Sequence, residues 1–242
     1  MSGTLLQAWQ AVANHPLFWV GVTLAAYQLG VALYQRTKLA VFHPVLVSTA
    51  VLVLVILAAG QDYAHYREAV QPLQVLLGPA TVALAVPLYM NFRRIRSYFW
   101  PVLICLLVGG TLATVLAVLL AWLLGAEPMI MMTLAPKSVT SPIAMLVAEQ
   151  IGGVAALAAV FVMFTGVLGA IFGPMLLRLC GVDHPAAWGM AMGLTAHAVG
   201  TSRALEEGEE AGAFSALAMS LMGTATALLL PLAWRLVGIG AG

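Results

Sequence analysis

The chain has 242 residues, of which 62% are hydrophobic and 8% charged, and its formal net charge is +1. Soluble domains carry about 25% charged residues, so the composition excludes a soluble domain and predicts an integral membrane protein in contact with the lipid bilayer. The small net charge argues against a nucleic-acid partner. Cys105 and Cys180 both lie in apolar runs, which predicts buried thiols rather than a disulfide or a metal site.

Runs of about 20 apolar residues are long enough to cross a bilayer as helices. The clear runs are 17–35, 41–60, 101–124, 153–177 and 211–234, and the runs interrupted by glycine, proline or polar residues are 73–91, 128–150 and 185–203. The connections between them are too short for a soluble domain. We therefore expect a single polytopic membrane domain over 1–242, an all-α bundle of seven or eight segments with Gly/Pro-broken helices.

Basic residues indicate the orientation, because short loops that carry them stay in the cytoplasm. The basic clusters after the first and third apolar runs are both cytoplasmic if the N-terminus lies outside. Two models remain for the following part. If 128–150 crosses fully, Arg178 lies outside and the acidic run 206–210 inside. If 128–150 is re-entrant, Arg178 and Arg235 lie inside and the acidic run outside, which fits the basic residues better.

The sequence TLAPKSVTSPIAM at 133–145 is unusually polar for a membrane segment. A proline lacks an N–H and clashes with the carbonyl four residues earlier, so Pro136 and Pro142 predict two half-helices with an open stretch between them. Ser141 followed by Pro142 favours a helix start, with the hydroxyl as N-cap. Broken backbone at membrane depth is tolerated only where it is buried in protein or lines a wet cavity.

Lys137 lies in this open stretch, where a lysine costs about 2.5–3.5 kcal/mol on membrane insertion. It could reach the membrane surface, or it could form a structural ion pair with Glu149 or Glu206. We favour a third hypothesis, in which Lys137, the helix end at Ser141 and nearby hydroxyls bind an anion. Half-helix N-termini have that role in secondary transporters.

A second polar stretch, GLTAHAVGTSRALEEGEE, covers 193–210. Gly200 is the predicted helix break, after which Thr201 or Ser202 would cap a new helix. His197 titrates near neutrality and could relay a proton, or it could simply form a hydrogen bond with a neighbouring helix. Arg203 could clamp a carboxylate, or it could pair with the acidic run at the surface.

A third stretch, LGPATVALAVPLYMNFRRIR, covers 77–96. Gly78 and Pro79 are predicted to start a short helix that Pro87 interrupts two turns later. A proline-kinked spanning helix and a binding element are equally compatible with this pattern. Three broken segments in one small bundle are typical of a transport site.

The chain contains no P-loop, HExxH or GxSxG sequence and no Cys/His cluster with metal spacing. These absences argue against ATP-driven and hydrolytic activity. We therefore expect neither an enzyme nor a bound metal or cofactor.

Several motifs carry a resemblance to a known family. They are PATVALAVPLY (79–89), PKSVTSPIAM (136–145), LGAIFGPMLL (168–177), GLTAHAVGTSRALE (193–206) and GAFSALAM (212–219). With them the chain resembles the LrgB/CidB family over about residues 40–235. That family includes bacterial holin-like and antiholin-like membrane proteins and the plastid glycolate/glycerate translocator.

The resemblance implies a site made of Lys137, Ser138, Thr140, His197, Gly200, Thr201 and Arg203. Ala211 departs from the family, which usually has a polar or acidic residue there.

The resemblance implies two alternative functions. The first is transport of small monocarboxylates such as pyruvate, glycolate or glycerate, coupled to protons or running as exchange. Lys137 and the Ser141 helix end would hold the carboxylate, Arg203 would assist, and His197 would carry or gate the proton. The alternative is a holin- or antiholin-like protein that regulates murein hydrolase activity and cell lysis.

The same resemblance implies a small membrane partner of the LrgA/CidA type and a multi-pass location in the bacterial cytoplasmic (inner) membrane. Rows of small residues recur at every fourth position, as at Gly169 and Gly173. They favour helix packing within the bundle and leave a homo-oligomer open.

Overall fold

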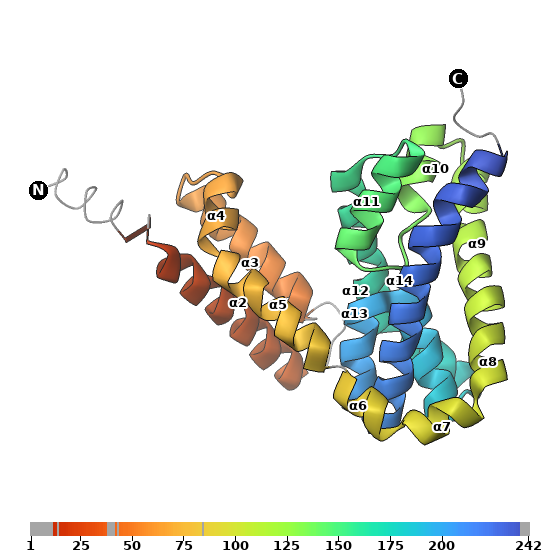
Figure 1. The fold of residues 1–242 in the computed structure, drawn as a ribbon. Coiled ribbons are helices and arrows are strands. Elements are labelled where there is room, and N and C mark those ends of the chain that lie inside the picture. Colours follow the sequence, from red (N-terminus) through yellow and green to blue (C-terminus); the bar gives the residue numbers. More distant parts are fainter. Residues whose placement is uncertain (1–11, 14, 38–41, 43, 84, 238–242) are drawn as a thin grey trace, which may run out of the picture. The chain divides into compact units, whose positions relative to one another are not determined.

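The structure, a computed structural model, describes residues 12–13, 15–37, 42, 44–83 and 85–237. Within these ranges the regular elements are all helices (Figure 1). The predicted all-α membrane class is therefore confirmed. By its internal contacts the chain divides into two compact units, Met1–Ala83 and Leu84–Gly242, and the expected single domain over 1–242 stays a prediction.

The first unit contains four described helices. They are α2 (Pro16–Thr37), α3 (Pro44–Ala58), α4 (Tyr63–Ala69) and α5 (Gln71–Ala83). Trp19 is fully buried against the end of α4, and its indole N–H donates to the carbonyl of Ala13 at 2.7 Å. The chain bends by 119° between α3 and α4.

The predicted helix start at Gly78 and Pro79 differs from the structure. Helix α5 passes through both residues without a break. A membrane helix tolerates a proline where the loss of one backbone hydrogen bond is compensated by its surroundings. The described part of α5 ends at Ala83, and the next described helix begins at Ala85.

The second unit contains the remaining described helices. They are α6 (Ala85–Met90), α7 (Phe92–Ser97), α8 (Phe99–Ile104), the π-helix η2 (Cys105–Gly109), α9 (Gly110–Leu123), α10 (Pro128–Leu134), α11 (Ser141–Ile151), α12 (Ala155–Leu179), α13 (Pro185–Glu207) and α14 (Glu209–Val237). Cys105 and Cys180 are exposed. The prediction of buried thiols is therefore wrong, because Cys105 lies on the outer surface of η2 and Cys180 in the exposed turn after α12.

Four of the described helices are long and apolar enough to cross a membrane: Leu17–Thr37, Phe99–Leu123, Ala155–Leu179 and Glu209–Leu236. The bent pair α3 and α4 would make a fifth. The predicted seven or eight segments exceed this number because the three interrupted runs form shorter or doubled-back helices.

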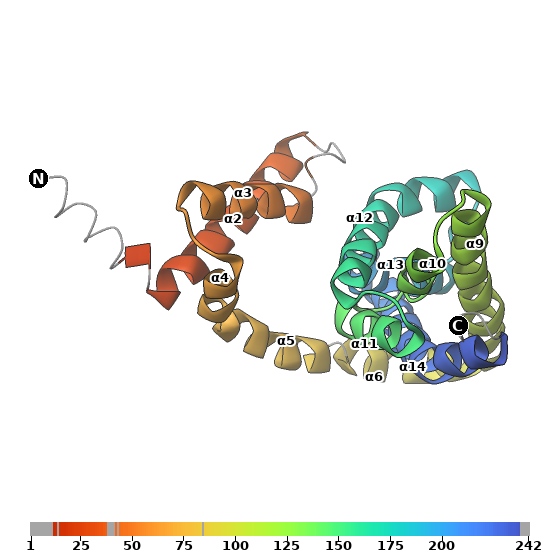
Figure 2. The same cartoon turned by 90° about the horizontal axis from the view of Figure 1, so that it is seen from above.

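Helices α10 and α11 form a helical hairpin, named hairpin 1 here (residues 128–151). The residues that follow α11 return to α10, since the Val154 N–H donates to Thr133 Oγ1 at 3.0 Å. Thr133 is fully buried and donates in turn to the carbonyl of Met129 at 2.7 Å. Figure 2 shows α10 inside the second unit, between α9, α11 and α12. The segment near 128–150 thus folds as a hairpin, and its re-entry into the membrane stays a prediction.

Helix α13 also doubles back, and it is named hairpin 2 here. His197 has φ 41° and ψ −129°, which breaks the helix into the halves 185–196 and 198–207. A Cβ atom on Gly200 would lie 2.5 Å from the carbonyl oxygen of Met192, although these residues would be about 12 Å apart in a straight helix. The predicted break at Gly200 is therefore wrong. Gly200 instead provides the space in which the two halves approach each other.

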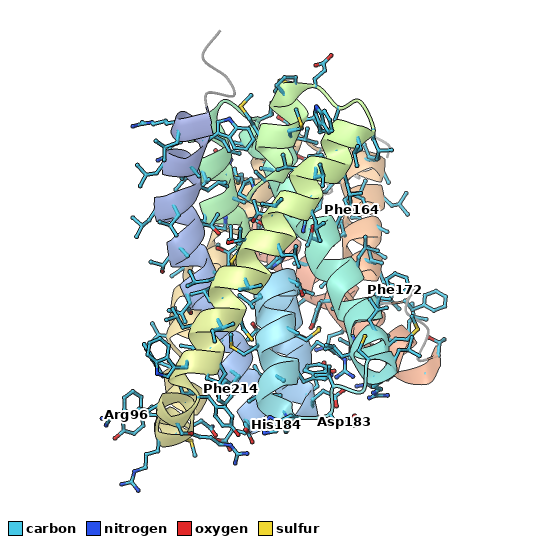
Figure 3. The ribbon with its side chains drawn as sticks, turned by 90° about the vertical axis from the view of Figure 1, so that its right-hand side faces the viewer. Arg96, Phe164, Phe172, Asp183, His184 and Phe214 are labelled. Carbon is cyan, nitrogen blue, oxygen red and sulfur yellow. The ribbon has the colours of Figure 1, made fainter. Side chains whose placement is uncertain are left out.

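This second hairpin changes the predicted topology. Arg178 Nη2 lies 3.7 Å from Glu207 Oε1, and Arg94 Nε lies 2.7 Å from Glu210 Oε1. Both sequence models placed Arg178 and the acidic run on opposite sides of the membrane, and both are wrong in this respect. Since 185–207 returns to the end at which it starts, the acidic run lies beside Arg178. Asp183, His184 and Arg96 lie at this same end (Figure 3).

The two hairpins begin at opposite ends of α12. This helix has 25 residues and is therefore about 37 Å long. It starts directly after hairpin 1 and ends shortly before hairpin 2. A spanning helix followed by a hairpin thus occurs twice in opposite orientation, as 99–151 and as 155–207. Inverted repeats with discontinuous helices are a recurring architecture of secondary transporters.

Candidate functional site

The tip of hairpin 1 is the irregular stretch 135–140, which contains Lys137. Helix α10 ends at Leu134, just before Pro136, and α11 begins after Thr140, whose backbone is extended (φ −68°, ψ 149°). The N-cap is therefore Thr140, one residue before the predicted Ser141. No side chain caps the N-terminus of α11, so its N–H groups stay available to a bound group.

Lys137 is half-buried in this tip and has a neutral partner. Its Nζ donates to Ser138 Oγ at 3.2 Å, and Ser138 itself is buried. The ion pairs of the described residues involve Arg94, Arg178 and Arg203, and none involves Lys137. The structural ion pair with Glu149 or Glu206 is therefore not formed within the described part of the chain. Lys137 brings a formal positive charge that no described carboxylate neutralises.

The tip of hairpin 2 is His197, which is 4% exposed. Its Nε2 lies 2.9 Å from the carbonyl oxygen of Val162 on α12. Of the described residues other than glycine, His197 alone has a positive φ. Such a backbone conformation costs about 1–3 kcal/mol and persists only where the surroundings enforce it.

Two buried hydroxyls continue from this tip into α14. Thr201 Oγ1 donates to the carbonyl of His197 at 2.9 Å and lies 3.0 Å from Ser215 Oγ. The two hydroxyls are hydrogen-bonded to each other, and either can be the donor. Ser215 is fully buried. The sequence reasoning did not single out Ser215, although the quoted motif at 212–219 contains it.

The two tips lie close together inside the second unit. Val139 of hairpin 1 and Leu194 of hairpin 2 belong to one buried cluster with Met222 of α14. Helix α11 and the half-helix 198–207 both begin at these tips. Two partially positive helix ends thus converge beside one ammonium group. This arrangement is suited to binding an anion.

Other predicted site residues lie elsewhere. Arg203 donates to the carboxylates of Glu206 and Glu207, as in the surface-pair alternative, and it lies about 9 Å along the half-helix from His197. Gly78 and Pro79 belong to the first unit, and Pro87 lies in α6. The described residues contain no group of three or more His, Cys, Asp or Glu side chains placed to hold a metal.

An apolar cavity of about 200 Å³ lies beside the tips, between α9 and α14. Its few polar side chains are Thr111, Thr114 and Thr226. Met222 lines this cavity and also packs in the cluster that contains Val139. Neither Lys137 nor His197 lines this cavity.

Comparison with known proteins identifies the family. The LrgB-like family model matches residues 23–236. An uncharacterised protein of Haemophilus influenzae is 33% identical over 89% of this chain and 94% of its own length. The antiholin-like protein LrgB of Bacillus mycoides is 29% identical over 92% of this chain and 97% of its own length. No solved structure matches. The chain is therefore a membrane protein that belongs to the LrgB-like family.

Proposed function

We propose that the chain transports small monocarboxylates, such as pyruvate, glycolate or glycerate, across the bacterial cytoplasmic membrane. The observation that carries the proposal is the meeting of two oppositely oriented hairpin tips at Lys137, which has no described carboxylate partner. One ammonium group matches the single charge of a monocarboxylate. The N-terminus of α11 and the hydroxyl of Ser138 would supply further hydrogen bonds to the carboxylate.

His197 is the group that we propose for coupling to protons. It lies buried at the tip of hairpin 2, against the Val162 carbonyl of α12. Its imidazole is a group that can take up and release a proton. A carboxylate bound at Lys137 would favour the protonated imidazole, so anion and proton would bind together. Exchange of one carboxylate for another remains the alternative form of transport.

Uptake of labelled glycolate or pyruvate into proteoliposomes tests the proposal. We expect uptake by the unmodified protein, strong loss with Lys137→Ala, and loss of the response to a pH gradient with His197→Ala. Arg36→Ala is a matched control, because Arg36 is an exposed basic residue at the end of α2 in the first unit. Transport that survives both tip substitutions would refute the site.

A second candidate function is antiholin-like control of murein hydrolases and cell lysis. The names of the Bacillus relatives support it directly, whereas the geometry of the tips supports transport. A protein that forms or regulates membrane lesions has no need for a substrate site. Dye leakage from liposomes without selectivity for size or charge would favour this second function over carboxylate transport.

Either function could require a second protein. We propose a small membrane protein of the LrgA/CidA type as the partner, and a homo-oligomer as the alternative assembly. Measurement of transport and of particle mass with and without the co-expressed partner would distinguish a chain that is active alone from one that acts only in a complex.

A further inference from the structure

The imidazole of His197 lies against α12 at a position where α12 has a glycine. A Cβ atom on Gly166 would be 2.6 Å from His197 Cε1 and 2.7 Å from Nε2. It would also lie 3.1 Å from Cγ2 of Val199 on the same hairpin. Contacts below 3.0 Å require the ring to shift. Only a residue without a side chain at 166 leaves room for the imidazole in this position.

The hydrogen bond made in this position determines where the ring carries its proton. The Val162 carbonyl lies one helical turn before Gly166 and can only accept a hydrogen bond. Nε2, 2.9 Å away, must therefore carry the hydrogen. In the neutral ring the lone pair is then on Nδ1. Among the described residues the ring makes no second hydrogen bond, so Nδ1 remains available as an acceptor.

We propose that Gly166 is a positioning residue, which holds His197 as the Nε2–H tautomer and so presents Nδ1 as the atom that accepts a hydrogen bond or a proton from the bound molecule. The proposal deepens the proposed function, because the acceptor is useful only if an anion binds at the tips. It assigns a role to α12, whose Val162 carbonyl and Gly166 both contact the ring. The other ring nitrogen, which donates to Val162, serves to orient the ring.

The first test is the tautomer itself, measured by ¹⁵N NMR on protein labelled at histidine. The chain has five histidines. The pair of ring nitrogen signals that disappears in the His197→Gln variant belongs to His197. We expect a protonated Nε2 and an unprotonated Nδ1 for neutral His197. A protonated Nδ1 in the unmodified protein would overturn the proposal without any variant.

The second test compares Gly166→Ala with a control. The control is Gly109→Ala, because a Cβ on Gly109 would meet Leu194 Cδ1 of the same hairpin at an ordinary 3.5 Å. We expect Gly166→Ala to shift both ring nitrogen signals of His197 and to weaken binding of glycolate, whose hydroxyl can donate to Nδ1, about tenfold, as expected for the loss of one hydrogen bond. Gly109→Ala should leave the signals and the affinity unchanged.

The outcomes separate this proposal from the proposed function. A folded Gly166→Ala protein with unshifted His197 signals would refute the positioning role, even if the protein transports carboxylates. If Gly166→Ala does not fold, the tautomer of the unmodified protein still decides. If the signals shift but neither glycolate nor pyruvate binds the unmodified protein, the ring is positioned as proposed and carboxylate binding is refuted.

Discussion

Replacement of Lys137 by methionine should make the protein more stable while removing anion binding. The Lys137 ammonium donates to Ser138 and pairs with no described carboxylate, so the substitution leaves no opposite charge unpaired. A lysine at the centre of a membrane helix costs about 2.5–3.5 kcal/mol. Because Lys137 is only half-buried, at a helix break, this range is the upper limit of the gain in unfolding free energy.

The opposite sign is expected if Lys137 has a structural role. Removing one partner of a buried ion pair destabilises a protein by about 3–5 kcal/mol. The two hypotheses for Lys137 thus differ in the direction of the change as well as in its size. Thermal unfolding of the purified protein in detergent, without added anion, distinguishes them. A lower unfolding temperature for Lys137→Met would refute the reasoning that assigns the charge to a bound anion.

The same variant tests binding. A hydrogen bond to a charged group contributes about 1.5–3 kcal/mol, so Lys137→Met should weaken binding of glycolate or pyruvate by about 10–150-fold. A ligand at 100 times its dissociation constant raises the unfolding free energy by about 2.7 kcal/mol, and most of this increase should vanish in the variant. Arg36→Met, at an exposed position of α2, should retain the full ligand-dependent increase.

Three further substitutions test the packing and the limits of the site. Gly193→Ala should lower stability by about 1–3 kcal/mol, since its methyl group would overlap the carbonyl of Ser215; an unchanged unfolding temperature would contradict this close approach of α13 and α14. Thr133→Val should cost about 1–3 kcal/mol because the Val154 N–H loses its acceptor, whereas Thr133→Ser keeps the hydroxyl, so equal stability of the two variants would argue against that bond. Arg203→Met should leave the affinity for glycolate within about twofold, as for an exposed ion pair. A tenfold loss would instead place Arg203 in the binding site.

Hairpin 1 could be predicted from the sequence because its break is encoded locally. Pro136 and Pro142 each remove a helical hydrogen bond, and the structure places the irregular stretch 135–140 between them. Even the end of α11 follows a local rule, since Gly152 adopts the left-handed conformation (φ 92°) of a helix C-terminus. The N-cap of α11 is Thr140, one residue before the predicted Ser141. Both residues precede Pro142 and carry a hydroxyl, so either can serve as a cap.

Hairpin 2 could not be predicted in the same way, because the sequence has neither glycine nor proline at its break. The positive φ of His197 is held by contacts with α12, namely the Val162 carbonyl and the space above Gly166. These residues are more than thirty positions earlier in the chain. The break was predicted at Gly200 because glycine favours helix breaks. In the structure Gly200 instead allows the two halves of α13 to pack closely. Because the reversal of the chain at His197 was not predicted, both sequence models placed the acidic run 206–210 on the opposite side of the membrane from Arg178.

The energetic cost of the two tips bears on the choice between the proposed functions. Lys137 places a charge where insertion costs at most about 2.5–3.5 kcal/mol, and His197 adopts a backbone conformation that costs about 1–3 kcal/mol. Neither cost is needed to pack a bundle, since leucine at 137 and glycine at 197 would avoid both. A lesion former needs only apolar and small-residue helices, so it would gain nothing from either residue. A binding site for a small anion gains from both, because the charge attracts the anion and the fixed imidazole orients it.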